Sequence, residues 1–213
     1  TLSDPLRVRR LSERKFAVDG TPTDCVMLAM QELMPQKPDL VLSGVNRGQN
    51  LAEDVTMSGT VAGAIQGMAL GVPAVALSQS LLIFQHDVTP MFGTSEAFAP
   101  GIIRQALEAG WPSDVILNLN FPDLPPDEVK AVEVTRQGFR DVVNFHFEKR
   151  TDLRGRDYYW TGYGRARANP EQGTDLRAIY DGKISITPLH IDLTHMPTVH
   201  ALKQVLGGAP PKA

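Results

Sequence analysis

The chain has 213 residues, a formal net charge of −3 and one cysteine. This length is enough for one substantial hydrophobic core, and the absence of a basic excess argues against a DNA- or RNA-binding protein. A single thiol excludes an internal disulfide and suits a reducing compartment. No apolar run reaches the roughly 18 residues of a membrane span. We therefore expect a cytoplasmic protein with neither nucleic acid nor membrane as a partner.

The chain opens with strand-like sequence. Residues 6–11 and 15–18 are typical of two short strands around a charged turn. Thr21, Pro22 and Asp24 then have the spacing of an N-cap, a first helical residue and a capping box. This pattern predicts a helix that ends near Met34 and packs Cys25 into the core.

Residues 38–79 have the order strand, polar loop, helix, strand. The apolar run 39–42 turns polar at Ser43, as in a buried parallel strand whose carboxyl end opens into a crevice. A polar loop at 44–57 and a small-residue helix at about 61–70 follow, and Gly71 and Pro73 end that helix before the next strand at 74–77. The loop is therefore where we expect the chemistry.

The helix of this unit begins with Ser58, Gly59 and Thr60. Ser58 is a good N-cap, and Gly59 lets backbone donors approach a ligand closely. Unpaired N–H groups and a partial positive charge at such a terminus favour an anion, most often phosphate. The alternative is an ordinary capped helix that binds nothing. The spacing matches neither the dinucleotide fingerprint nor the P-loop.

The alternation of helix and strand continues, with a helix at 95–109, a strand at 115–119 and a more exposed strand at 130–135. This order predicts an α/β fold with a mainly parallel sheet covered by helices on both faces. In the loop before the helix, His86 and Asp87 are a candidate general-acid pair, for which an ordinary solvated histidine is the alternative.

The C-terminal part has a different texture. Two aromatic-rich extended runs, 139–150 and 157–164, flank a turn with Gly155 and predict a long hairpin arm over 139–164. Two strands cannot bury so many rings alone, so the arm needs a partner surface. A short helix at 174–180, a strand at 184–188 and a terminal helix at 197–206 follow. His190, Asp192 and His195 are a candidate metal cluster, although their spacing fits no helical histidine pair.

Several motifs resemble the signature of the SurE family, the survival protein E nucleotidases. They are SGVNRGQN at 43–50, EDV at 53–55 and SGTVA at 58–62, with supporting matches at 20–25, 117–122, 134–136, 173–175 and 184–190. The resemblance implies a Rossmann-like core at 1–137 and a C-terminal oligomerisation part at 138–213. It also implies that the hairpin arm is exchanged between subunits of a homodimer or homotetramer.

The resemblance further implies a phosphatase that depends on one divalent metal ion, Mg²⁺ or Mn²⁺, and hydrolyses nucleoside 5′-monophosphates, with 3′-monophosphates and short polyphosphate as further candidate substrates. Asn46 would be a metal ligand through its amide oxygen, and Asn50, Ser58, Gly59 and Thr60 would line the phosphate pocket. The family pattern also contains paired aspartates in an Asn-Asp-Asp-Gly segment and a further serine ligand. We expect that segment, with the nucleophile and the general acid, upstream of Thr1.

Two rival functions remain at this point. One is a non-catalytic nucleotide-binding module, which would bind nucleotide without turnover whatever metal is added. The other is an assembly protein whose aromatic hairpin is itself the functional element. Oligomer formation without any ligand-dependent change in melting temperature would favour the second.

Overall fold

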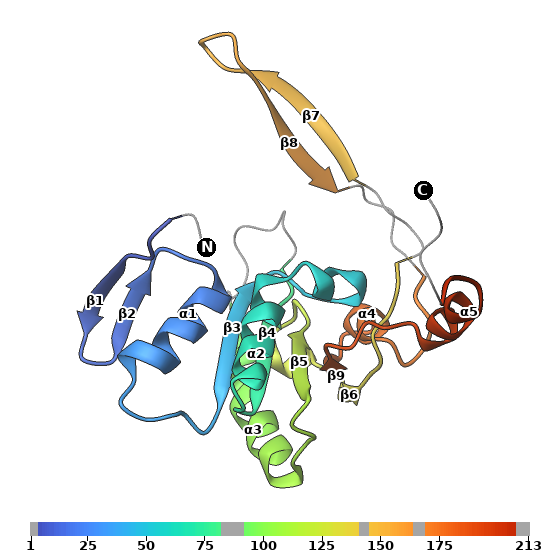
Figure 1. Cartoon of the computed structure of the whole chain (residues 1–213). Helices are drawn as coiled ribbons and strands as arrows, with labels where there is room; N and C mark the ends of the chain where they lie inside the picture. Colours follow the sequence, from blue (N-terminus) through green and yellow to red (C-terminus); the bar gives the residue numbers. More distant parts are fainter. Residues whose placement is uncertain (1–3, 82–91, 141–144, 164–168, 208–213) are drawn as a thin grey trace.

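The computed structural model describes residues 4–81, 92–140, 145–163 and 169–207. Its body is a five-stranded sheet in the order β3-β4-β5-β9-β6, with helices on both faces (Figure 1). The strands are β3 (Val41–Arg47), β4 (Ala74–Gln79), β5 (Val115–Phe121), β6 (Val132–Val134) and β9 (Ile184–His190). The α/β fold class expected from the alternation of elements is confirmed.

The sheet is mixed. β3, β4 and β5 run parallel to one another, whereas β9 is antiparallel to β5 and parallel to β6. The first three strands are joined by helical crossovers, which place their carboxyl ends along the upper edge of the body in Figure 1. β9 belongs to the predicted C-terminal part at 138–213, yet it is a strand of this sheet. The division of the chain into two parts at residue 137 stays a prediction.

Helices cover the two faces unequally. On one face lie α1 (Pro22–Leu28), which continues as the π-helical turn η1 (Ala29–Leu33), and α2 (Gly59–Ala69). On the other lies α3 (Gly93–Ala109), which ends at Gly110. Each face has its own apolar cluster, one built from α2 and the strands, the other from α3 and the opposite side of β4 and β5. Short 3-10 turns, η2 (Ala52–Thr56) and η3 (Pro126–Glu128), connect these elements.

Two hairpins and two helices complete the described chain. β1 (Val8–Ser12) and β2 (Lys15–Val18) pair near the amino terminus. β7 (Phe145–Thr151) and β8 (Asp157–Tyr163) form the predicted arm, which projects clear of the body in Figure 1. α4 (Asp175–Tyr180) packs near the sheet, and α5 (Met196–Leu206) is the terminal helix. The hairpin is thus confirmed, whereas its exchange between subunits is not tested.

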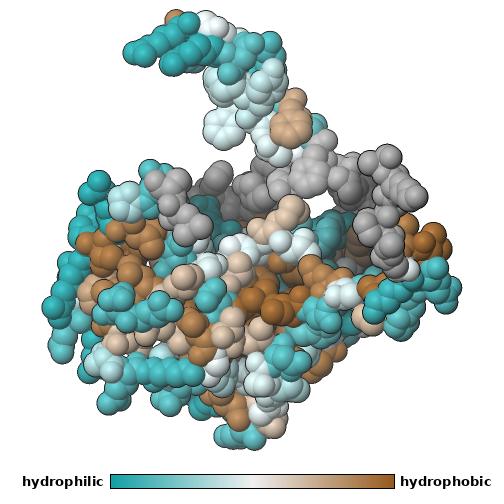
Figure 2. Space-filling view, in the orientation of Figure 1, coloured by the Kyte–Doolittle hydropathy of each residue, from teal (hydrophilic) through white to brown (hydrophobic). Residues whose placement is uncertain are grey.

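Three local expectations need correction. β3 extends to Arg47, so Asn46 lies on the strand and not in a loop. Leu42 is 49% exposed, because β3 is an edge strand among the described residues. Cys25 is only partly buried, and the first helix changes to a π-helical turn at Ala29. Figure 2 shows apolar side chains over the surface formed by β1, β2 and α1, where Met27 is substantially exposed.

Candidate functional site

The carboxyl end of β3 changes course next to β4. The pairing register of the two strands shifts between Ser43 and Asn46. Gly44 has a φ of 126°, and a Cβ there would lie 2.3 Å from the carbonyl oxygen of Leu77. Only glycine fits so close to the neighbouring backbone. This close approach sets the position from which Asn46 and the following loop leave the sheet.

The loop after β3 is closed by local hydrogen bonds. The Nδ2 of Asn46 donates to the carbonyl of Gly48 at 2.9 Å. The N–H of Gly48, whose φ is 114°, donates to the carbonyl of Gln79 at 2.9 Å. The Oδ1 of Asn46 has no hydrogen-bond partner in the described part of the chain. That amide oxygen is therefore free to accept from, or coordinate, a ligand.

Asn50 is 8% exposed and is held by side chains of the two neighbouring strands. Its N–H donates to Oδ1 of Asn120, and its carbonyl accepts from Nδ2 of Asn118 and of Asn120. Its own Nδ2 donates to Oγ of Ser78 at 2.7 Å. An amide nitrogen carries two N–H groups, so the second N–H of Nδ2 is not used by this bond to Ser78. The role of Asn50 in lining a phosphate pocket stays a prediction.

The amino end of α2 carries unsatisfied donors. Ser58 is the N-cap, and its Oγ accepts the N–H of Val61 at 3.1 Å. The N–H groups of Gly59 and Thr60 have no acceptor among the described residues, and neither has the hydroxyl of Thr60, although that residue is 8% exposed. Two aligned N–H groups, two hydroxyls and the positive end of the helix dipole suit one anion.

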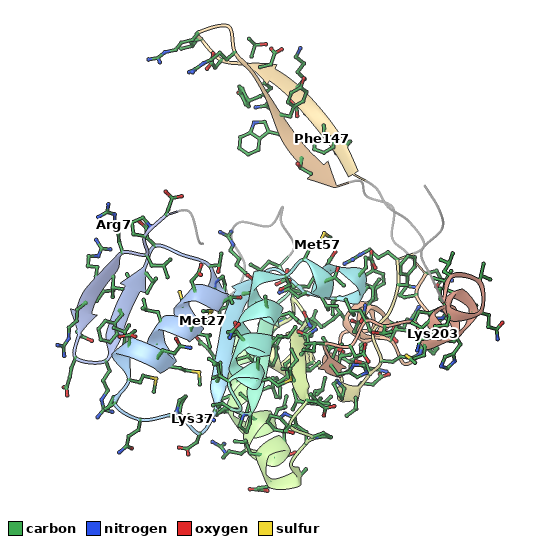
Figure 3. All side chains as sticks on the ribbon, in the orientation of Figure 1. Arg7, Met27, Lys37, Met57, Phe147 and Lys203 are labelled. Carbon is green, nitrogen blue, oxygen red and sulfur yellow. The ribbon has the colours of Figure 1, made fainter. Side chains whose placement is uncertain are left out.

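Small residues bring this helix end close to its neighbours. A Cβ on Gly63 would lie 2.6 Å from Oγ of Ser43 and 3.2 Å from Cβ of Pro22. A Cβ on Gly59 would lie 3.4 Å from the Pro22 ring. The capped start of α1, with the predicted box between Thr21 and Asp24 confirmed, therefore lies beside the start of α2. Met57, labelled in Figure 3, precedes the N-cap on the upper side of the body, the side from which the arm projects.

Glu53 and Asp54 lie shortly before the start of α2, and both form ion pairs with Arg140 at the base of the arm. Arg140 contacts Oε1 of Glu53 at 3.2 Å and Oδ2 of Asp54 at 2.7 Å. The backbone N–H of Arg140 also donates to Glu53. Burial raises the pKa of Glu53, but its backbone hydrogen bonds and the bonds and charge of Arg140 outweigh this, so the net pKa is lowered. Arg140 thus offsets one of the two negative charges that precede the start of α2.

Asp175 joins three segments. It is fully buried, and its carboxylate accepts the N–H groups of Ala52, Gly138 and Leu176 at 2.7–2.8 Å. Burial raises the pKa of Asp175 by more than these three hydrogen bonds lower it. The bond to Ala52, a non-glycine residue with a φ of 54°, secures the turn between Asn50 and Ser58. Asp175 therefore acts as a structural link between the loop and the base of the arm.

The described residues do not by themselves make a divalent-cation site. No group of three or more His, Cys, Asp and Glu side chains in the described ranges is placed to hold a metal. Asn46 offers one neutral oxygen, whereas Mg²⁺ is held in proteins by carboxylates in near-octahedral geometry. The candidate cluster at His190, Asp192 and His195 is not formed: Asp192 accepts the N–H of Thr194, and His195 pairs with Thr198. The pair at 86–87 lies outside the described residues.

The sequence-predicted site residues therefore fall in two places. Ser58, Gly59 and Thr60 lie together at the start of α2, whereas Asn46 and Asn50 belong to the end of β3 and its loop. Sequence reasoning missed the supporting groups, Arg140, Asp175 and Ser78. The alternation in the Asn-Leu-Asn segment at 118–120 carried a signal, because two amides on one face of an apolar strand are unusual.

Comparison with known proteins agrees with the motif resemblance. Residues 1–144 match the family model described as Survival protein SurE. The chain is 67% identical over 213 residues to the 5′-nucleotidase SurE of Caulobacter vibrioides strain NA1000, covering 100% of this chain and 81% of the relative. It is 64% identical to the 5′-nucleotidase SurE of Phenylobacterium zucineum, with coverage of 100% and 82%.

The fold has a counterpart among solved structures. The crystal structure of the SurE protein from Aquifex aeolicus superposes with a TM-score of 0.77 at 39% sequence identity, covering 96% of this chain and 81% of that one. The match to the family model over more than half of the chain and the high identity to these relatives lead to one conclusion. The chain belongs to the SurE family.

Proposed function

We propose that this protein is a 5′-nucleotidase that hydrolyses nucleoside 5′-monophosphates to nucleoside and phosphate. The observation that carries the proposal is the set of unsatisfied donors at the start of α2, the N–H groups of Gly59 and Thr60 with the hydroxyls of Ser58 and Thr60. The relatives named 5′-nucleotidase SurE support the choice of substrate. Nucleoside 3′-monophosphates and short polyphosphate present the same terminal phosphate and are proposed as secondary substrates.

In the reaction, a water oxygen bonds to phosphorus, the phosphorus–oxygen bond to the nucleoside breaks, and the departing oxygen takes a proton. Negative charge is spread over the three equatorial oxygens of the transferring group at the transition state. Donors fixed at the start of α2 stabilise that charge without having to reorganise. Arg140 helps indirectly, because its positive charge offsets part of the negative charge of Glu53 and Asp54 upstream of the helix. No described residue is assigned as nucleophile or general acid.

We also propose that hydrolysis requires one divalent ion, Mg²⁺ or Mn²⁺, and that Asn46 supplies one neutral ligand. The free Oδ1 of Asn46 supports this role. The other ligands of the ion would come from outside the described residues, because no group of three or more His, Cys, Asp and Glu side chains among the described residues is placed to hold a metal. When bound, such an ion would polarise a phosphoryl oxygen.

Assembly through the arm is part of the proposal. The register of β7 and β8 places Phe147 and Tyr159 on one face of the ribbon and Tyr158 and Trp160 on the other. All four rings are substantially exposed, Phe147 at 69%. A two-stranded ribbon has no core of its own, so rings on both faces favour enclosure by a second copy, in a homodimer or a homotetramer.

No described helix is long and apolar enough to cross a membrane. We propose a cytoplasmic location for this protein.

The central test uses Thr60→Val in the full-length protein. Phosphate binding is measured by calorimetry, and AMP hydrolysis is measured with Mg²⁺ or Mn²⁺ and with EDTA. We expect EDTA-sensitive hydrolysis by the wild type, and a loss of about 1.5 to 3 kcal/mol in phosphate binding in the variant, the scale of a hydrogen bond to a charged group. The control is Thr187→Val, which removes another buried hydroxyl, one that is bonded to Thr135.

Ser58→Ala separates anion binding from capping. Loss of the cap alone predicts a destabilisation of about 1 kcal/mol with unchanged phosphate affinity, whereas a phosphate ligand predicts that both quantities fall. Nucleotide binding without turnover at any metal concentration would replace the proposed enzyme by a binding module.

A further inference from the structure

The carboxamides of β5 and the hydroxyl of Ser78 on β4 enclose Asn50. Four hydrogen bonds of 2.7–3.0 Å join Asn50 to these strands: one from its N–H, two to its carbonyl and one from its side chain. The donors and acceptors come from residues 28 to 70 positions further along the chain. The middle of the loop is therefore fixed by the sheet and not by its own local sequence.

These partners occupy positions where apolar side chains would be the ordinary choice. Ser78, Asn118 and Asn120 are each 0% exposed. The Oδ1 of Asn118 has no hydrogen-bond partner in the described ranges, and leaving a buried acceptor unpaired costs stability. The unpaired oxygen of Asn118 is therefore a stability cost that accompanies the bond from its Nδ2 to Asn50, and this points to a role in the geometry of the loop.

The loop that Asn50 anchors connects the two halves of the candidate site. Four residues before Asn50 is Asn46, on the last part of β3, and eight residues after it is the N-cap Ser58. If the middle of the loop were free, each ligand-binding event would have to order it, and that ordering would weaken binding. Fixed supporting side chains remove this requirement.

We propose that Ser78, Asn118 and Asn120 are positioning residues for the phosphate site, acting through Asn50 and touching no substrate themselves. This inference rests on the proposed function. Asn118 and Asn120 hold the Asn50 carbonyl, Asn120 also holds its N–H, and Ser78 sets the orientation of its amide. The loop thereby keeps one conformation in the absence of ligand.

The test compares Asn118→Leu and Ser78→Ala with Ser185→Ala in the full-length protein. Asn118→Leu removes one donor to Asn50 and also the unpaired oxygen, at similar side-chain volume. Ser185 is a control for the loss of a buried hydroxyl next to the same side chains: it is 0% exposed, lies opposite Asn120 on β9 and bonds to the hydroxyl of Thr135, but it makes no hydrogen bond to Asn50. Phosphate affinity is measured by calorimetry, and amide hydrogen exchange of residues 46–52 is measured without ligand.

We expect both test variants to bind phosphate about tenfold more weakly, which corresponds to about 1.4 kcal/mol, and to exchange faster over residues 46–52. Asn118→Leu should melt at or above the wild-type temperature, whereas Ser185→Ala should lose stability with unchanged phosphate affinity and unchanged loop exchange.

The inference would be overturned if Asn118→Leu and Ser78→Ala both kept the phosphate affinity and the loop hydrogen exchange of the wild type. It would also be overturned if Ser185→Ala changed these two quantities as much as the test variants do. If wild-type protein bound no phosphate and hydrolysed no AMP, the proposed function would fail. Loop exchange would then still decide the positioning role by itself. If Asn118→Leu does not fold, Ser78→Ala provides the same two measurements.

Discussion

The close packing of α2 on β3 gives a pair of substitutions with opposite consequences for stability and for binding. Gly63 and Gly67 lie one turn apart on α2. A Cβ on Gly63 would meet Oγ of Ser43 at 2.6 Å, and one on Gly67 would meet three carbons of Val41 at 2.8–3.0 Å. Carbon atoms pack best at about 3.5–4.0 Å. Each Gly→Ala substitution must therefore displace the helix or its neighbour by several tenths of an ångström to roughly 1 Å.

The stability effects combine two terms of opposite sign. Replacing glycine by alanine inside a helix gains about 1 kcal/mol in propensity, and overpacking costs about 1–3 kcal/mol. Gly67→Ala meets the branched body of Val41, which has no alternative position, so we expect a net destabilisation of about 1–2 kcal/mol. Gly63→Ala meets the hydroxyl of Ser43, which can rotate, and Cβ of Pro22 at 3.2 Å, which cannot. Its net effect on stability should therefore be smaller, about 0–1 kcal/mol, while the start of α2 still has to shift away from Pro22.

The binding effects should have the reverse order. Gly63 lies one turn from Thr60, so displacement at this point moves the N–H groups of Gly59 and Thr60 relative to β3. A shift of this size at the donors should weaken phosphate binding about tenfold, whereas Gly67→Ala, a turn further away, should change it less than about twofold. Thermal melting and phosphate calorimetry on both variants test this. Phosphate affinity that follows stability in both, or wild-type affinity in Gly63→Ala, would refute the argument.

The remaining predictions concern pH and assembly. Because the pKa of Glu53 is lowered in the folded protein, its pairing with Arg140 contributes stability that is present above the ordinary value of 4.5 and is lost as pH falls through the folded value. Glu53→Gln should flatten this acid limb in melting curves recorded from roughly pH 3 to 7, and an unchanged limb would show that the pair contributes nothing. Asp175 acts in the opposite sense: its raised pKa gives a contribution that is present below 3.8 and is lost as pH rises through the folded value. Asp175→Asn should remove that rise in stability at low pH. It should also lose one of the three hydrogen bonds that backbone N–H groups donate to Asp175, because the amide nitrogen cannot accept. For the arm, combined Tyr159→Ser and Trp160→Ser should reduce the mass measured by light scattering, whereas an unchanged mass would show that these rings are not an interface.

Local signals made the main elements of the site predictable. The caps at Thr21 and Ser58 fixed the starts of α1 and α2, because a side-chain acceptor three residues before an unpaired N–H is a strictly local device. The two aromatic-rich extended runs on either side of Gly155 likewise identified the hairpin. The start of α2, where we propose that phosphate binds, could therefore be located without any tertiary information.

The supports of the site could not be predicted in this way. Arg140 lies 86 and 87 residues from the two carboxylates that it pairs with, and Asp175 lies 123 residues from Ala52. No local rule selects those partners among 24 acidic residues. The strand at 184–188 was predicted, but its antiparallel direction was equally hidden, because strand direction depends on the route of the chain and not on the residues of the strand. The edge position of β3 explains why Leu42 is exposed although its sequence favours burial.

The separate origins of these supports explain why the loop between β3 and α2 can be so polar and still be ordered. Its middle is held by β4 and β5 through Asn50, its turn by α4 through Asp175, and its two carboxylates by Arg140 at the base of the arm. The contacts of Asn50 and Asp175 satisfy polar groups that would otherwise be buried unpaired. The geometry of the phosphate site is therefore a property of the completed sheet and its attached helices, and substitutions far from the helix end should alter ligand affinity when they break one of these three attachments.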